Sequence, residues 1–336
     1  MRHKLKIGHI LPVMLLASGV ACAQARIGLS VPLGETAPRL AAQMRAGAQA
    51  AADARGAELV VADDKCTEEG GRASAERFID EEVEAVVGYL CTEAVEAALP
   101  ALTEAGILVI ATGIRTDSLT DRRERTGWSV FRLGPRADAE QDAAARYVVD
   151  NWRGSLFAII DDGTIYGREI AETVRIAAEE SGLSPAFVDT FRPQLDNQIG
   201  LIGRLRRSGA SHVFVGGDRA DVAIIARDAA GLDYSLTVAG GEALRAPSGD
   251  VELAEGVVMI AATDWSEGEQ EGYYRPTYAA VEIAVDAAGS EDLAAALADG
   301  TFETVIGSVS FDDKGDMDGD LYQPYRFDGS SFVPVD

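Results

Sequence analysis

The 336-residue sequence predicts an α/β protein with two doubly wound lobes, in which helices cover both faces of a largely parallel sheet. Short apolar runs alternate with helical repeats in the first half of the chain, and the same alternation begins again near Ser155. A chain of this length also exceeds one comfortable hydrophobic core. Because no Pro/Gly/Ser-rich linker separates the halves, we expect strand-like crossovers between the lobes.

The clearest unit of the first half lies between residues 83 and 113. An apolar run at 83–87 is followed by Val95, Ala98, Leu99 and Leu102, which fall at i, i+3, i+4 and i+7, and then by a second run at 107–111. This order is typical of a βαβ unit in a parallel sheet. The preceding elements are expected to be strands at 26–31 and 58–62 and helices at 41–54 and 72–82.

The second half repeats the alternation. Strands are expected at 155–160, 186–191, 212–215 and 236–239, and helices at 168–181, 199–207 and 220–230. The helices end near Gly182, Gly209 and Gly231, as helix C-termini commonly do. The tail should then form helices at 273–288 and 293–298 and a strand at 305–311.

An acidic run at 312–320 follows that strand and resembles a calcium loop in composition. An EF-hand needs an oxygen ligand at its third position and a glutamate at its twelfth. Counted from Asp312, these positions hold Lys314 and Gln323, so the motif fails. After residue 23 the sequence has one histidine and two distant cysteines, which give no zinc site. We therefore expect neither a metal nor a cofactor.

The N-terminus has the pattern of a secretory leader. A basic start and an apolar stretch precede the small-residue site Ala21-Cys22-Ala23, so we expect residues 1–23 to be removed during export. A lipoprotein anchored at Cys22 is the less favoured alternative, because Gly19 stands where such sites usually carry a larger aliphatic residue. No later segment of the sequence approaches the length of a membrane span.

The charge of the chain excludes some partners. The leader contains three of the 30 basic residues and none of the 55 acidic ones, so the remaining chain has a net charge of −28. Such a chain repels phosphate backbones and anionic membrane surfaces. We therefore expect no nucleic-acid partner.

Cys66 and Cys91 are the two cysteines beyond the leader, and each follows an apolar strand. An even number in an exported protein favours a disulfide over a metal site or a reactive thiol. Neighbouring strand ends could bring the pair within bridging distance. Two unpaired buried thiols are the alternative.

The sequence offers little for catalysis. Most hydrolytic triads need a histidine, and beyond the leader the sequence has only His212, inside an apolar strand. We expect a structural histidine there, because nothing nearby completes a triad. No glycine-rich phosphate loop follows the first strand. The prediction is therefore a protein that is not an enzyme, with a secreted hydrolase as a remote alternative.

Polar residues gather in the loops that follow the strands. The carboxyl ends of parallel strands form the usual ligand edge of an open sheet, and helix N-termini there offer free N–H groups. The candidate ligand-binding residues are Thr92, Gly113, Arg115, Thr116, Tyr166, Asp218 and Glu242. Each also has an ordinary interpretation, such as a helix cap for Thr92 or an ion pair with Asp117 for Arg115.

Seven motifs occur in a characteristic order: Asp63-Asp64-Lys65-Cys66, Gly88-Tyr89-Leu90-Cys91-Thr92, Tyr166-Gly167, Gly216-Gly217, Gly241-Glu242, Thr277-Tyr278-Ala279-Ala280 and Phe311-Asp312-Asp313-Lys314-Gly315-Asp316. Together they resemble the periplasmic leucine/isoleucine/valine-binding protein family, the type I solute-binding proteins of ABC transporters. The resemblance covers nearly all of the chain after the leader. It also implies that Cys66 and Cys91 form the family's disulfide.

The resemblance implies two lobes joined by three crossovers, near 131–136, 259–264 and 314–325, that close on a ligand by hinge motion. Lobe 1 would contain residues 24–133 and 262–315, and lobe 2 residues 134–261 and 316–336. It further implies a periplasmic protein, expected to be a monomer, that hands a small molecule to an ABC permease in the inner membrane. A sensing module that signals to a membrane partner is the alternative.

For the ligand, the resemblance implies that Thr92 binds a carboxylate, that Glu242 binds an ammonium and that Tyr166 covers both from the second lobe. The chain departs from the family at Arg115, where a threonine is expected, and at Asp218, where an aromatic residue is frequent. A guanidinium offers a fixed fork of donors for a carboxylate. If Arg115 faces the cleft, we expect a ligand with an acidic group beyond, or other than, that of a simple amino acid. If it faces outward, an aliphatic amino acid remains expected.

Overall fold

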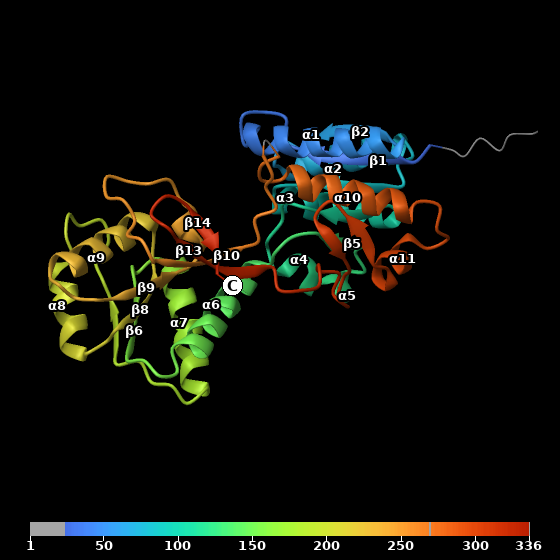
Figure 1. Cartoon of the computed structure of the whole chain (residues 1–336). Coiled ribbons are helices and arrows are strands. Elements are labelled where there is room, and N and C mark those ends of the chain that lie inside the picture. Colours follow the sequence, from blue (N-terminus) through green and yellow to red (C-terminus); the bar gives the residue numbers. More distant parts are fainter. Residues whose placement is uncertain (1–23, 269, 336) are drawn as a thin grey trace, which may run out of the picture.

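The structure is a computed structural model that describes residues 24–268 and 270–335. Figure 1 shows two α/β lobes on either side of a narrow junction. Each lobe has one main sheet, and a separate two-stranded hairpin completes the first lobe. The predicted leader and Cys22 lie outside the described residues. No helix in the described part of the chain combines the length and apolar character that crossing a membrane requires.

The first sheet is parallel throughout and has the strand order β2-β1-β3-β4-β5. Its strands are β1 (Arg26–Val31), β2 (Glu58–Asp63), β3 (Ala85–Gly88), β4 (Leu108–Ala111) and β5 (Val130–Arg132). One face is covered by α1 (Pro38–Arg55) and α10 (Tyr274–Ala287), and the other by α2 (Glu68–Asp80) and α3 (Thr92–Glu104). Apolar side chains fill both interfaces, as a doubly wound lobe requires.

A glycine allows the close contact between α1 and α10. A Cβ atom on Gly47 would lie 2.1 Å from the carbonyl oxygen of Tyr274, far inside van der Waals contact. The helix that returns from the end of the chain therefore packs against the first helix backbone to backbone. Residues more than 200 positions apart thus share one core.

The second sheet has the strand order β14-β13-β10-β9-β8-β6-β7. Its strands are β6 (Phe157–Asp161), β7 (Phe187–Thr190), β8 (His212–Gly216), β9 (Thr237–Gly240), β10 (Val258–Ala262), β13 (Tyr322–Phe327) and β14 (Phe332–Pro334). Strands β6 to β10 are parallel, whereas β13 and β14 are antiparallel to their neighbours. Helices α6 (Ala137–Asn151) and α7 (Ile165–Glu180) cover one face, and α8 (Ile199–Ser208) and α9 (Arg219–Gly231) the other. The predicted fold class is confirmed.

The short elements were predicted less well. Residues 305–311 do not form one strand. Instead, β11 (Phe302–Thr304) and β12 (Gly307–Val309) pair as a hairpin that follows α11 (Leu293–Asp299). Gly307 has a φ of 103°, which tightens the turn, and the Thr304 hydroxyl donates to the Gly307 carbonyl at 2.7 Å. Strands β13 and β14 and the single-turn helices α4 (Ser118–Asp121) and α5 (Arg123–Thr126) were not predicted, and β5 and β10 fall where only crossovers were expected.

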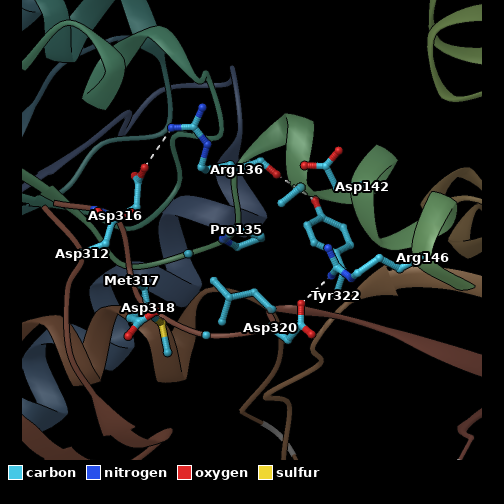
Figure 2. A pocket seen from close by; sticks show the side chains of 14 residues that line it. Pro135, Arg136, Asp142, Arg146, Asp312, Asp316, Met317, Asp318, Asp320 and Tyr322 are labelled. Atoms are coloured by element: carbon cyan, nitrogen blue, oxygen red, sulfur yellow. Dashed lines mark hydrogen bonds and ion pairs between the residues drawn. The ribbon is translucent and has the colours of Figure 1, made fainter. Parts of the chain in front are cut away.

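The chain passes between the lobes three times, at 133–136, between β10 and α10, and at 317–321. The second crossover was expected near 259–264, but residues 258–262 form strand β10. The first and third passages are joined where Arg132 meets Asp316. The Arg132 N–H donates to the Gly315 carbonyl at 2.8 Å, and the Met317 N–H donates to the Arg132 carbonyl at 2.9 Å. The Arg132 Nε donates to Asp316 at 2.7 Å, and both side chains are buried. Asp316 also pairs with Arg136 at 2.9 Å (Figure 2).

The acidic run therefore belongs to the junction of the two lobes. Asp312 accepts the backbone N–H groups of Lys314 and Asp316, each at 2.9 Å, and so shapes the turn that presents Asp316 to the arginines. This use of the run agrees with the crossover turn that the resemblance implied.

Candidate functional site

The disulfide fixes the first loop of the site. Cys66 and Cys91 are bonded, with their Cα atoms 5.1 Å apart, so the predicted pair is confirmed. Behind it, buried Asp64 accepts the N–H of Cys66 and the hydroxyl of Ser30, each at 2.9 Å. Burial raises the pKa of Asp64, although these two hydrogen bonds oppose the shift. The bond ties the loop after β2 to the first residue before α3.

Thr92, Gly113 and Thr116 lie together at the carboxyl edge of the first sheet. The hydroxyl oxygens of Thr92 and Thr116 are 2.7 Å apart. Thr92 is not a helix cap, because α3 is capped at Cys91 without a side-chain hydrogen bond. A Cβ atom on Gly113 would lie 2.5 Å from the Leu90 side chain, so the glycine allows the two loops to pack.

Tyr166 is held on the second lobe by a carboxylate that the sequence analysis missed. Its hydroxyl donates to Oε1 of Glu140 at 2.6 Å, and the same oxygen accepts the backbone N–H of Glu242 at 2.6 Å. Burial raises the pKa of Glu140, and burial together with the charge of Glu140 raises the pKa of Tyr166. A Cβ atom on Gly241 would lie 2.2 Å from the Tyr166 hydroxyl, so this arrangement needs glycine there.

Glu140 could have been found from helical periodicity. It stands three and four positions before Ala143 and Ala144, on the buried face of α6, and is itself only 8% exposed. A carboxylate on an otherwise apolar helix face needs hydrogen-bond partners. Here the partners are the Tyr166 hydroxyl and the backbone N–H of Glu242.

Arg115 and Glu242 form an ion pair between the lobes. Arg115 follows β4, Glu242 follows β9, and Nη1 of the arginine lies 2.5 Å from Oε2 of the glutamate. Arg115 therefore faces the cleft. Asp117, the partner considered as the ordinary alternative, accepts the N–H of Ala137 at 3.1 Å. Burial alone lowers the pKa of Arg115, but the hydrogen bond and charge of Glu242 outweigh it and raise that pKa above its ordinary value.

Arg245 is a second guanidinium at this point, and it was not predicted. Its Nε lies 3.6 Å from Glu242 and its Nη1 3.8 Å from Asp264. The guanidinium also stacks over the ring of Tyr325, 5.5 Å from the centroid. The three-residue spacing from Glu242 in the short helix η1 (Glu242–Arg245) was the available signal.

A cavity of about 180 Å³ lies between the lobes beside this ion pair. Arg115, Glu242 and Arg245 line its polar side, and Trp265 and Tyr273 bring two aromatic rings to it. The aromatic residues belong to the second crossover, where the strand-end pattern used to select candidates does not apply. Ligand pockets usually measure about 300 to 1,000 Å³, so this cavity suits a small solute or one part of a larger one.

Asp218 does not line the cavity, and neither do Thr92, Gly113, Thr116 and Tyr166. Asp218 caps α9 by accepting the N–H of Asp221 at 2.9 Å and is exposed. Its role toward a ligand stays a prediction, as do the ligand contacts of the other six candidates.

A second cavity, of about 240 Å³, lies beside the first and third crossovers. Figure 2 shows that Arg136 points toward Asp316 and Arg146 toward Asp320. The hydroxyl of Tyr322 donates to the Arg136 carbonyl at 3.3 Å. These charges pair with one another at the hinge, and the candidate ligand residues lie elsewhere.

Comparison with known proteins gives a consistent result. A model of the periplasmic binding protein family matches residues 24–273. A relative, Leu/Ile/Val-binding protein homolog 1 of Brucella abortus (strain 2308), is 27% identical over 365 residues, which cover 98% of this chain and 97% of the relative.

Two solved structures share the fold. An ABC transporter substrate-binding protein from Desulfitobacterium hafniense, in complex with Leu, is 21% identical with a TM-score of 0.66, over 93% of this chain and 100% of its own. A solute-binding protein of an ABC transporter from Rhodopseudomonas palustris BisB5, in complex with 3,4-dihydroxy benzoic acid, is 17% identical with a TM-score of 0.61, over 93% and 96%.

Proposed function

Because the chain belongs to the periplasmic binding protein family, we propose that it is the solute-binding component of an ABC importer. It takes an amino acid or a related small carboxylate between its lobes. The observation that carries this proposal is the ion pair between Arg115 and Glu242, which joins facing strand ends of the two sheets beside a small cavity. A solute that contacts both lobes favours their closure, to the extent that it binds the closed state more tightly.

The carboxylate of the solute binds at the edge of the first sheet. Thr92 and Thr116 offer hydroxyl groups there, and the N-terminus of α3, a 13-residue helix, adds backbone N–H groups and a partial positive charge. Gly113 lets the loop after β4 pack against Leu90 at this edge, and Tyr166 approaches from the second lobe. Both solutes named in the two solved structures, Leu and 3,4-dihydroxy benzoic acid, are carboxylic acids.

Each lobe moves as a unit during closure. Residues 24–133 with 262–315 form lobe 1, and residues 134–261 with 316–336 form lobe 2, except that Ala262 ends β10 and so belongs to the sheet of lobe 2. The first sheet and α10 support the first grouping, and the antiparallel strands β13 and β14 on the second sheet support the other. Asp218 lies at the rim of lobe 2, where it meets a solute only on closure.

The protein is a binder and not an enzyme. Its family carries solutes for transport, and its described histidine is used structurally: His212 begins β8, bonds Ser211 at 2.8 Å and lies 5.2 Å from the ring of Trp152. A turnover assay on the bound solute tests this, and conversion of that solute would contradict it.

The protein works in the periplasm, as a monomer, and delivers its solute to a permease in the inner membrane. Family membership supports the compartment, and the predicted leader is the route of export. A strong net negative charge is consistent with a protein that avoids the anionic membrane surface until it meets its partner.

A thermal-shift screen tests the proposal. The mature chain is screened against amino acids, dicarboxylates, aromatic acids, amides and polyamines, and any molecule that copurifies is identified by mass spectrometry. A bound solute at 100 times its dissociation constant adds about 2.7 kcal/mol to the free energy of unfolding. We expect a carboxylate to give the largest shift. A screen in which only amides or polyamines stabilise the protein would contradict the proposal.

A further inference from the structure

We infer that the solute held between the lobes is a carboxylate without an ammonium group, because the guanidinium of Arg115 occupies the place beside Glu242 that an ammonium would need. The inference rests on the proposed function and specifies which carboxylates fit. Three observations support it. Each carboxylate that lines the cavity lies within 4 Å of a guanidinium, two neighbouring carbonyl oxygens already accept hydrogen bonds, and much of the cavity wall is apolar.

The carboxylates that line the cavity are those of Glu242 and Asp264. Glu242 lies 2.5 Å from Arg115 and 3.6 Å from Arg245, so two guanidinium groups compete for it. Asp264 is half-exposed and lies 3.8 Å from Arg245. An ammonium that enters the cavity therefore loses water and must share each lining carboxylate with a guanidinium, which is unfavourable.

Glu140 is another carboxylate near the ion pair, and its hydrogen bonds are already made to other groups. It is buried behind Gly241 and does not line the cavity, and its Oε1 accepts both the Tyr166 hydroxyl and the Glu242 N–H. Turning it toward a solute would leave both donors unpaired, which costs free energy.

Two carbonyl oxygens near the ion pair have partners as well. The Arg115 carbonyl accepts the N–H of Ala137 at 2.9 Å, and the Ala262 carbonyl accepts from the Arg245 guanidinium. These oxygens are the usual substitutes when an ammonium lacks a carboxylate. Each of these two oxygens already accepts one hydrogen bond and therefore has one lone pair left for an ammonium.

The groups that remain suit an anion with an apolar body. Arg115 has five N–H donors and directs its terminal amines at Glu242. A carboxylate of the solute can therefore bind the same guanidinium beside Glu242. The walls are supplied by Ile114, Leu133 and Pro276 and by the rings of Trp265 and Tyr273. The solute class is therefore a carboxylate that has an aliphatic or aromatic skeleton and carries no amine.

Calorimetry with matched probes tests the inference. The mature chain is titrated with L-leucine and 4-methyl-2-oxopentanoate, and with L-phenylalanine and 3-phenylpropanoate. Each pair keeps the carbon skeleton; a keto oxygen replaces the amine in the first pair, and hydrogen replaces it in the second. We expect the wild-type chain to bind at least one amine-free acid about tenfold or more tightly than its amino acid, because an ammonium beside two guanidinium groups is repelled.

Two variants locate the effect. In Arg115→Thr, Glu242 regains room for an ammonium, and we expect the ratio within the pair to fall by about tenfold or to reverse. Arg204→Thr is the matched control, because Arg204 also forms a half-exposed ion pair, with Asp189 at 2.6 Å, on the far side of the second sheet. The control should keep the wild-type ratio. Circular dichroism verifies that both variants fold.

The possible results distinguish a failure of the amine-free specificity from a failure of the proposed solute-binding function. An amino acid that binds wild type as tightly as its amine-free partner, or more tightly, overturns the inference and leaves the solute-binding proposal standing. An unchanged ratio in folded Arg115→Thr also overturns it. If no carboxylate in these pairs or in the thermal-shift screen binds, the proposed function fails together with the inference. If Arg115→Thr does not fold, the wild-type ratio decides.

Discussion

The guanidinium of Arg115 lies 2.5 Å from the carboxylate of Glu242, and the two residues belong to different lobes. The side chains are 41% and 18% exposed, so the pair itself stabilises the contact between the lobes only modestly, by roughly 1 kcal/mol or less. Its larger effect is on the charge that a solute meets. A solute that enters the cleft meets a carboxylate already neutralised by arginine.

Glu242→Gln distinguishes this arrangement from an ammonium-binding site. Removing the carboxylate releases Arg115 from its partner, so we expect the affinity for 4-methyl-2-oxopentanoate to stay equal or rise by up to about fivefold, or ~1 kcal/mol. Isothermal titration calorimetry measures this affinity. Glu172→Gln, which breaks an exposed pair with Arg175 on α7, is the control. A large loss of affinity in Glu242→Gln alone would show that the solute needs the carboxylate.

Gly241→Ala should damage the second lobe's side of the site. The new Cβ atom would lie 2.2 Å from the Tyr166 hydroxyl and 2.4 Å from Oε1 of Glu140, so both groups must move. We expect a cost of about 1 to 3 kcal/mol in unfolding free energy, measured by chemical denaturation, together with weaker solute binding. Gly154→Ala, where nothing lies within 4 Å of the new atom, serves as the control. Equal stability of the two variants would refute the packing argument.

Asp316→Asn tests the junction of the lobes. Asp316 is buried and pairs with Arg132 and Arg136, so its removal leaves a buried guanidinium without a counter-charge. Breaking such a pair costs about 3 to 5 kcal/mol. Asp320→Asn, which removes a 78% exposed partner of Arg146, should change the melting temperature little. Similar melting temperatures for both variants would mean that the Arg132 pair does not stabilise the fold.

Glu140 predicts a pH dependence of stability. Burial raises its pKa in the folded chain above the ordinary value of 4.5, so between these two values the folded chain holds a proton that the unfolded chain has lost. This group therefore makes the free energy of unfolding fall as the pH rises from 4.5 through the folded pKa. Glu140→Gln removes the effect and keeps an oxygen acceptor. We expect the stability of the variant relative to wild type to increase between pH 4.5 and pH 7, and a constant difference over that range would contradict the assignment.

The sequence was sufficient to predict the features that depend on local pattern. The alternation of apolar runs and helical repeats gave the doubly wound lobes, and the position of Cys66 and Cys91 at strand ends gave the disulfide. The motif order led to the family that the comparisons identify. Each of these depends on residues close in sequence or on spacing along the chain, which periodicity records directly.

The features that depend on the relation between lobes were not predictable in the same way. Arg115 was an open question because its partner, Glu242, is 127 positions away and meets it only when the sheets face each other. Trp265 and Tyr273 lie in a crossover without periodicity, and the β11–β12 hairpin is too short to show one. Glu140 is the one site residue on this side that the sequence could have indicated, because helical periodicity places it on the apolar face of α6.

Closure of the lobes on a carboxylate is the central claim, and small-angle scattering tests it most directly. The mature chain is measured alone and with the carboxylate that gives the largest thermal shift, at a concentration that calorimetry shows to be saturating. Closure of the two lobes predicts a smaller radius of gyration in the complex, because a solute bound by both lobes draws them together. An unchanged radius of gyration at full saturation would contradict it.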